Sequence, residues 1–91
     1  MKLSDRLQLI ADEIIAGETM ADIGTDHGFL PLYLMESGIC PHVIMADISK
    51  GSLAKADENC RLAGPGKTYD LRLGDGIDVL KDGEVDVVVI A

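Results

Sequence analysis

The sequence MADIGTDHGFL, residues 20–30, decides the fold of this chain. It joins an apolar, strand-like stretch to a helix-like stretch through a loop that contains Gly24 and Gly28. These glycines follow the spacing G-x-x-x-G, whereas a dinucleotide-binding loop carries G-x-G-x-x-G. Asp26 lies inside the loop, where it would face the pyrophosphate of a dinucleotide as a like charge. The loop is therefore either a damaged nucleotide motif or a loop built for a ligand of another kind.

Helical and strand-like patterns alternate on both sides of this loop. Apolar residues at helical spacing predict a first helix that is capped by Ser4 and ended by Gly17. Further strands and helices are predicted with the following bounds: strands at 19–23, 43–48, 69–73 and 85–91, and helices at 29–37, 49–63 and 77–81. Gly64 and Pro65 are expected to stop the second of these helices.

Strands that alternate with helices predict right-handed crossovers and a parallel sheet. The fold class is therefore α/β, a Rossmann-like sheet with strand order 3-2-1-4 that forms the first half of a doubly wound fold. The strand at 69–73 alternates polar and apolar residues, so we expect it at or near an edge. The segment 85–91 is nearly all apolar, so we expect a strand that is buried on both faces.

A strand buried in this way needs a neighbour on each side, so the chain is expected to be truncated after its fourth strand. Residues 1–91 would then form a single domain that is the N-terminal portion of a longer protein. In this form the fourth strand would be an exposed apolar edge, which favours self-association.

The composition limits the kinds of partner. The chain has 91 residues, of which 47% are apolar, and this suffices for one small globular domain. A net charge of -8 and the absence of a Lys/Arg cluster exclude a broad nucleic-acid-binding face. Cys40 and Cys60 form no CxxC motif, so we expect neither a disulfide framework nor a metal site, and the cytoplasm is the default location. No apolar run approaches a membrane span, and the N-terminus lacks the apolar block of a signal peptide.

Three aspartates follow the predicted strands, at the edge of the sheet where open parallel folds bind ligands. Asp22 ends the first strand and could orient the loop or meet a ligand ammonium. Asp47 ends the second strand, where a carboxylate can hold both hydroxyls of a ribose, and Asp75 follows the third, where it can accept from the amine of a base. Gly24 and Gly28 let the backbone approach a ligand and turn into the next helix. Each aspartate alone is more simply a cap or a solvated strand end, but their common edge favours a binding site.

The charge of these side chains favours S-adenosylmethionine over a dinucleotide. S-adenosylmethionine carries a sulfonium and an ammonium and has no phosphate, so Asp22 and Asp26 suit it. A nicotinamide-dependent oxidoreductase half-domain is the less favoured enzyme, and a non-catalytic module that acts as a scaffold is a further alternative. His27 is more simply a loop or cap residue than a general base, and Arg6 is more simply solvated than part of a cofactor pocket.

Five segments of the chain resemble one enzyme family. They are LSDRLQLIADEI, ADIGTDHGFLPLYL, GSLAKADENCRLAG, LRLGDGIDVL and DVVVIA, and they cover nearly all of the 91 residues. The chain is similar to the N-terminal part of the bacterial tRNA (adenine-N1)-methyltransferases that modify adenine twenty-two. The segment ADIGTDHGFLP is the most specific part of this resemblance.

The resemblance implies a class I S-adenosylmethionine-dependent methyltransferase with tRNA as its substrate. By position it assigns cofactor-binding residues to three motifs: Asp22, Gly24, Asp26, His27 and Gly28 to the first, Asp47 and Ile48 to the ribose motif, and Asp75 and Gly76 to the adenine motif. Family members continue beyond such a last strand into a glycine-rich segment that lines the catalytic pocket, and they carry a C-terminal helical domain. The resemblance therefore implies that most of the tRNA-binding surface lies outside this sequence and that the chain alone is inactive.

The chemistry of this reaction asks little of the protein. The N1 atom of adenine has a lone pair that can attack the methyl group of a sulfonium directly, so the enzyme has to align the reactants and exclude water. N1 lies on the Watson–Crick edge, so the base must be unpaired or flipped. The methylated adenine is cationic, and nearby carboxylates stabilise it. Asp26 is the candidate catalytic residue in this sequence for such an electrostatic role.

Overall fold

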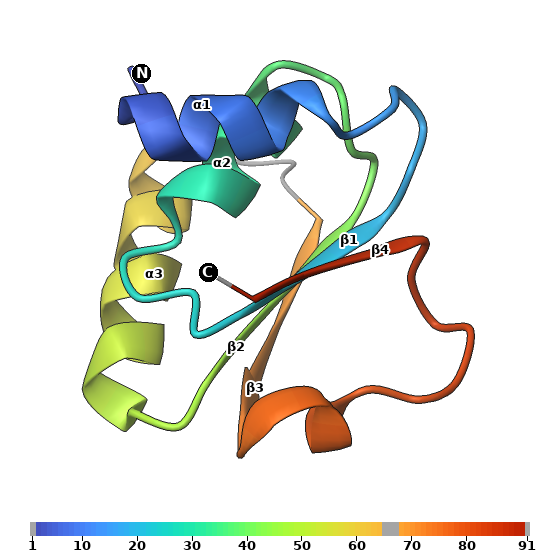
Figure 1. The fold of residues 1–91 in the computed structure, drawn as a ribbon. Helices are drawn as coiled ribbons and strands as arrows, with labels where there is room; N and C mark the ends of the chain where they lie inside the picture. Colours follow the sequence, from blue (N-terminus) through green and yellow to red (C-terminus); the bar gives the residue numbers. More distant parts are fainter. Residues whose placement is uncertain (1, 65–67, 91) are drawn as a thin grey trace.

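A computed structural model of the chain describes residues 2–64 and 68–90. Four strands form one sheet in the order β3-β2-β1-β4, and every neighbouring pair is parallel (Figure 1). The predicted fold class and strand order are therefore confirmed. The strands are β1 (Met20–Ile23), β2 (Val43–Asp47), β3 (Tyr69–Leu73) and β4 (Val87–Ile90), and the helices are α1 (Asp5–Asp12), α2 (Phe29–Glu36), α3 (Lys50–Leu62) and the short 3-10 helix η1 (Gly76–Val79).

Alternation along the strands separates two faces of the sheet. Met20 of β1 pairs in register with Val43 of β2, and both belong to the main hydrophobic cluster. On this side α2 packs against β1 and β2, α3 packs against β2 and β3, and α1 lies on α2 (Figure 1). The three α-helices thus bury one face of the sheet.

The opposite face is held by the segment between β3 and β4. Ile44 and Ala46 are buried there although they lie outside the main cluster. Arg72 lies on this face because it pairs in register with Ala46. Its guanidinium donates to the Val79 carbonyl (2.9 Å) and to the two carboxylate oxygens of Glu84 (2.6 and 2.5 Å). These bonds fasten the segment that carries η1 to the sheet.

Helix α1 begins as predicted but ends earlier. The Ser4 hydroxyl oxygen accepts a hydrogen bond from a backbone N–H of the first turn (3.3 Å), which confirms the predicted cap. The prediction that Gly17 ends the helix is wrong, because α1 stops at Asp12. Beyond it the Ile15 N–H donates to the Glu18 carboxylate (2.7 Å), so a side chain replaces the helical carbonyl as acceptor.

The other predicted boundaries agree with the structure to about two residues. Ser49 caps α3, since its hydroxyl accepts from the Ser52 N–H (3.2 Å). Gly64 follows the helix with φ +119°, as expected for a residue that ends one, and Pro65 lies outside the described residues. The helix predicted at 77–81 is a single 3-10 turn, because its segment is bound to Arg72 and Glu84 rather than to a longer helical ladder.

Strand β4 is not buried on both faces, so that prediction is wrong. Val89 is buried on the side of the main cluster, whereas Val88 and Ile90 are 44% and 69% exposed. Within the described residues β4 pairs only with β1, and an edge strand buries only the side chains that another layer covers. The prediction of an exposed apolar edge is confirmed, as is the edge position of β3, while self-association through β4 stays a prediction.

Candidate functional site

The loop after β1 is built on left-handed backbone. Gly24, Asp26 and Gly28 have φ values of +74°, +56° and +75°. Among residues 2–64 and 68–90, Asp26 is the only residue other than glycine with a positive φ. The Gly24 N–H donates to the Ala46 carbonyl (2.9 Å), and the Asp26 N–H donates to Asp47 Oδ2 (3.1 Å). The loop is therefore tied to the carboxyl end of β2.

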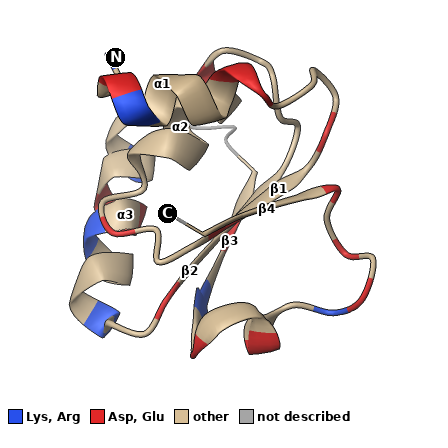
Figure 2. Cartoon of the chain, viewed as in Figure 1, with Lys and Arg blue, Asp and Glu red and all other residues tan. Residues whose placement is uncertain are grey.

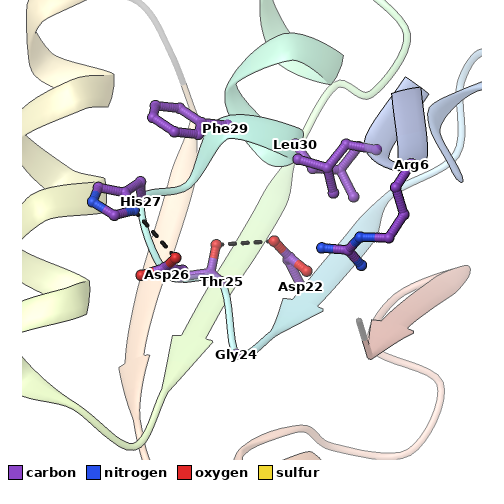
Figure 3. A pocket seen from close by; sticks show the side chains of 9 residues that line it. Arg6, Asp22, Gly24, Thr25, Asp26, His27, Phe29 and Leu30 are labelled. Carbon is purple, nitrogen blue, oxygen red and sulfur yellow. Dashed lines mark hydrogen bonds and ion pairs between the residues drawn. The ribbon is translucent and has the colours of Figure 1, made fainter. Parts of the chain in front are cut away.

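A cavity of about 250 Å³ lies between α1, the end of β1 and this loop (Figure 3). We call it the α1 cavity. Asp22 is its most buried acidic side chain, at 5% exposure, and the Thr25 hydroxyl donates to Asp22 Oδ2 (3.0 Å). Arg6 reaches into the cavity from α1 and points toward Asp22 (Figure 3). The lining residues are Arg6, Leu7, Asp22, Gly24, Thr25, Asp26, His27, Phe29 and Leu30.

Burial controls the protonation of Asp22. It raises the pKa of this carboxyl from 3.8 to about 6, against the hydrogen bond from Thr25, which lowers it. The charge of Asp47 raises the pKa further, and the charge of Arg6 lowers it. At neutral pH Asp22 is thus mostly ionised but poorly hydrated, and such a carboxylate favours a cationic partner.

The rim of the α1 cavity carries three exposed side chains. His27 Nδ1 lies 3.2 Å from Asp26 Oδ2, and these side chains are 45% and 73% exposed. The His27 ring stacks on Phe29 with centroids 5.3 Å apart. Asn59 of α3 donates to the His27 carbonyl (2.9 Å) and so fixes the backbone of the rim. Asp26 and His27 therefore contact each other and also remain open to a ligand.

A second cavity of about 290 Å³ lies at the carboxyl ends of β1, β2 and β3. We call it the β3 cavity. Asp47 Oδ1 accepts from the Ser49 N–H (2.9 Å), while its other oxygen accepts from the loop. Asp75 is exposed, and its carboxylate accepts no hydrogen bond from the part of the chain that the structure describes. The lining residues are Ile23, Gly24, Asp47, Ile48, Gly74, Asp75, Gly76 and Ile90.

Gly24 lines both cavities, so the two adjoin at this residue. A Cβ atom at Gly24 would meet nothing within 4 Å, which leaves space for a ligand. Gly28 lines neither cavity, and a Cβ there would lie 2.9 Å from the Ala56 Cβ. Close packing against α3 therefore explains why this position is glycine, and the cofactor-binding role of Gly28 stays a prediction. The other predicted site residues each line a cavity: Asp22, Gly24, Asp26, His27, Asp47, Ile48, Asp75 and Gly76.

Sequence reasoning missed part of the α1 cavity. Arg6, which was expected to be solvated, and its neighbour Leu7 line the cavity because α1 packs over α2. No local pattern marks this contact. Thr25 and Phe29 belong to the loop itself, so their position beside the predicted acids could have identified them.

Among residues 2–64 and 68–90, no three His, Cys, Asp or Glu side chains are grouped to hold a metal ion. Cys40 and Cys60 are buried and unpaired, and burial raises the pKa of the Cys60 thiol to about 11. None of the helices that the structure describes is long and apolar enough to cross a membrane.

The fold is an α/β domain with two adjoining cavities at the carboxyl edge of a parallel sheet, where open folds of this class bind ligands. Comparison of sequences then identifies the family. The chain belongs to the family described as a methyltransferase domain, whose sequence profile matches residues 3–91.

Individual relatives agree with this assignment. The chain is 38% identical to the Bacillus subtilis tRNA (adenine(22)-N(1))-methyltransferase over 91 residues, which is 100% of this chain and 38% of the relative. The crystal structure of the B. subtilis tRNA methyltransferase TrmK matches 98% of this chain with a TM-score of 0.90, at 38% identity and 38% coverage of that chain. These matches confirm the resemblance seen in the sequence.

Two further solved structures contain the cofactor or its product. TrmK from M. capricolum, in complex with S-adenosyl-homocysteine, matches 99% of this chain and 41% of its own length, with 32% identity and a TM-score of 0.89. A Streptococcus pneumoniae structure in complex with S-adenosyl-L-methionine matches 99% of this chain and 42% of its own length, with 30% identity and a TM-score of 0.89. The chain thus spans about two fifths of the length of these relatives.

Proposed function

We propose that this chain is the cofactor-binding part of an S-adenosylmethionine-dependent tRNA (adenine-N1)-methyltransferase, with residues 1–91 as one Rossmann-like domain of it. The observation that carries the proposal is the pair of cavities that adjoin at Gly24, each with an aspartate at the end of a parallel strand. The names of the relatives support it, since they include a tRNA (adenine(22)-N(1))-methyltransferase and complexes with S-adenosyl-homocysteine and S-adenosyl-L-methionine.

The α1 cavity suits the methionine end of this cofactor. Asp22 offers a poorly hydrated carboxylate, which favours an ammonium or sulfonium group. A pyrophosphate in the same place would face both Asp22 and Asp26, at an energetic cost that grows with burial. The arrangement therefore disfavours the nicotinamide-dependent alternative.

The β3 cavity suits the adenosine end. Each oxygen of Asp47 accepts one backbone hydrogen bond and has a further lone pair, so the carboxylate can still accept from two ribose hydroxyls. The exposed carboxylate of Asp75 is available to the amine of adenine. Ile48, at 72% exposure, offers apolar surface to the base, and Gly76 lets the backbone approach it.

When bound, the cofactor supplies an electrophilic methyl group for the N1 atom of adenine. The residues of this chain would hold the cofactor, shield it from water and stabilise charge. Asp26 carries an exposed carboxylate at the rim of the α1 cavity, beside His27, where it can stabilise the cationic methylated adenine. We therefore retain Asp26 as the candidate catalytic residue.

Most of the tRNA would be held by surface that this chain does not supply. The net charge is -8, which opposes binding to a phosphate backbone. Figure 2 shows the Lys and Arg residues spread over α1, α3, β3 and the loop before β4 instead of gathered in one patch. The tRNA therefore requires additional basic surface, which the longer relatives have room to provide.

Ligand-induced thermal stabilisation tests the cofactor. We expect S-adenosyl-homocysteine to raise the melting temperature of the chain and NAD to leave it unchanged, because a ligand stabilises only the state that binds it. Stabilisation by NAD alone would favour the oxidoreductase alternative, and stabilisation by neither would contradict the proposal. The base is then identified by mapping methylated positions on tRNA treated with the full-length protein. Cofactor binding by that protein without any methylation of tRNA would favour the non-catalytic module.

An Asp26→Asn change tests the catalytic assignment better than Asp26→Ala. Asparagine tolerates the left-handed backbone of this position, so the change removes charge without adding strain. In the full-length protein we expect the affinity for the cofactor or the turnover rate to fall by more than about tenfold. Binding and kinetics that both match the wild type would remove Asp26 from the site.

A further inference from the structure

We infer that Arg72 and Glu84 position Asp75 and so make the site selective for the exocyclic amine of a purine base. These two residues line neither the α1 cavity nor the β3 cavity. We call them, with the bonds that they make to the segment between β3 and β4, the Arg72 clamp. The inference rests on the proposed function and deepens it, because it names the residues that hold Asp75 in place.

Asp75 needs support from outside its own side chain. Its carboxylate is exposed and accepts no hydrogen bond from the described part of the chain, so no side-chain contact there fixes its direction. Its backbone lies between Gly74 and Gly76, and Gly76 has a left-handed φ of +59°. Glycine restricts the backbone less than any other residue type does. The position of Asp75 is therefore set by contacts at the two ends of its turn.

The start of this turn is held against β2. The Gly74 N–H donates to the backbone carbonyl of Asp47 (3.0 Å), and η1 packs against the same strand. A Cβ atom at Gly74 would overlap Val79 Cγ1, so the Val79 side chain lies directly on the Gly74 backbone. The turn from Gly74 to Val79 is therefore closed by a contact that only glycine permits.

The Arg72 clamp holds the other end of the turn. The Arg72 guanidinium donates to the carbonyl of Val79 (2.9 Å), which is the last residue of η1. It also donates to both carboxylate oxygens of Glu84, and Glu84 Oε1 accepts in addition from the Lys81 N–H (3.0 Å). The side chains of Arg72 and Glu84 are 24% and 23% exposed, so little water competes for these bonds. One side chain of β3 thus fixes the backbone on the far side of Asp75.

A turn that is held at both ends offers Asp75 as a preorganised acceptor. A hydrogen bond to the carboxylate strengthens binding most when the acceptor does not first have to be ordered. Adenine carries an exocyclic amine that donates to a carboxylate, whereas hypoxanthine carries a carbonyl oxygen there, which only accepts. A fixed carboxylate therefore discriminates between the two bases. A carboxylate on a loose turn could move away from the carbonyl oxygen and would tolerate both.

Two ligands that differ only in the base measure this discrimination. S-adenosyl-homocysteine carries adenine and S-inosyl-homocysteine carries hypoxanthine, so the contributions of the ribose and the amino acid cancel in the ratio of their dissociation constants. We expect the wild-type chain to bind the first about 10- to 100-fold more tightly in isothermal titration, as for one hydrogen bond to a charged group. Arg72→Ala should reduce this ratio by about three- to tenfold, because Asp75 then has to be ordered on binding.

Three variants sharpen the test and carry it if Arg72→Ala does not fold. Glu84→Gln keeps the size of the side chain and should lower the ratio by about threefold. Arg72→Lys keeps the charge without the planar fork that joins Glu84 to Val79, so its ratio should lie between those of Arg72→Ala and the wild type. Asp70→Asn is the matched control, because Asp70 pairs with the same guanidinium (3.3 Å) but belongs to β3 itself. The control should keep the wild-type ratio.

The outcomes distinguish the two levels of the proposal. If the Arg72 and Glu84 variants weaken both ligands equally, or weaken neither, the clamp does not set the preference and the inference is overturned. A loss of preference in Asp70→Asn as large as in Glu84→Gln also overturns it. A wild-type chain that binds both ligands with equal affinity overturns the inference but leaves the cofactor assignment standing. A wild-type chain that binds neither ligand overturns the proposed function, and this inference with it.

Discussion

The two cavities hold their acidic groups in different ways. In the α1 cavity Asp22 is 5% exposed, and burial raises its pKa to about 6. In the β3 cavity Asp75 is exposed, and Asp47 accepts hydrogen bonds from two backbone N–H groups. Burial of a carboxylate works against folding, whereas an exposed carboxylate with backbone partners supports local structure. The comparison separates Asp22, whose burial opposes folding, from Asp47, which also holds the local backbone.

The largest effect is expected where the fold and the ligand share one side chain. Asp47→Ala should weaken binding of S-adenosyl-homocysteine by about 100- to 1,000-fold, because two hydrogen bonds from the ribose to a charged group are lost. The loop also loses its bond from the Asp26 N–H. Isothermal titration measures the change in affinity. Asp47→Asn keeps one acceptor oxygen, so its affinity should lie between those of Asp47→Ala and the wild type. Wild-type affinity for Asp47→Ala would remove this residue from the ligand site.

Asp22→Asn should stabilise the folded chain in a pH-dependent manner. The folded state holds the proton of Asp22 more tightly than the unfolded state, so the stability linked to protonation is present below pH 3.8 and is lost as the pH rises through about 6. Asparagine does not ionise and can still accept from Thr25. Above the upper pKa we therefore expect a gain of up to about 3 kcal/mol in the free energy of unfolding, which disappears in acid.

Urea denaturation at several pH values measures this gain. Asp82→Asn is a suitable control, because it changes the same charge at an exposed position. A gain that does not vary with pH would show that the burial of charge is not its cause. The variant should also lose affinity for S-adenosyl-homocysteine, so that stability rises as binding falls.

Gly28→Ala should destabilise the fold by about 2 kcal/mol more than Gly38→Ala. Both glycines have a left-handed φ, +75° and +72°, so alanine is strained at either position. A Cβ atom would lie 2.9 Å from Ala56 at Gly28 and meet nothing within 4 Å at Gly38. The difference in the free energy of unfolding between the two variants therefore isolates the clash. Equal destabilisation would contradict the packing role given to Gly28.

The smallest effect is expected at the fastening of the β3 cavity. Glu84→Gln removes the charge that Arg72 binds, so the segment carrying Asp75 should loosen and adenosine affinity should fall by less than about tenfold. The Arg72 hydrogen bond lowers the pKa of Glu84 to about 2, so this ion pair is complete above pH 4.5 and breaks only in strong acid. The loss of affinity should thus be constant across the neutral range. A loss that is larger than that of Asp47→Ala would reverse the order proposed for the two contacts.

Much of this arrangement could be predicted from the sequence, since it depends on local patterns. β1 and β2 are apolar runs with an aspartate at or next to the last residue, so their burial and the position of Asp22 and Asp47 follow from periodicity. The end of α1 could not be predicted in this way, because the Glu18 side chain supplies the acceptor that ends the helix. The exposure of β4 was missed for another reason. An apolar sequence indicates that the side chains of a strand can be buried, but the elements packed on each face of the sheet determine which of them are buried.

The site shows the same division. Acids at strand ends were predicted because the topology alone brings such ends to one edge. Arg6 was missed because its position depends on the packing of α1 over α2. This is a contact between separate segments, which the spacing of residues within one segment does not predict. The explanation of Gly28 was also beyond the sequence, since the neighbour that excludes a side chain is Ala56 on α3.

The two hydrogen bonds of Asp47 have a consequence for ligands that are smaller than the whole cofactor. This carboxylate lines the β3 cavity and also holds the backbone of Asp26, which belongs to the wall of the α1 cavity. A nucleoside that engages Asp47 would therefore change the free energy of arranging the other cavity, and by reciprocity a free amino acid there would change nucleoside affinity by the same factor. Adenosine and methionine, added as separate fragments, should accordingly bind cooperatively. The intact cofactor does not show this coupling, because it fills both cavities in one binding step.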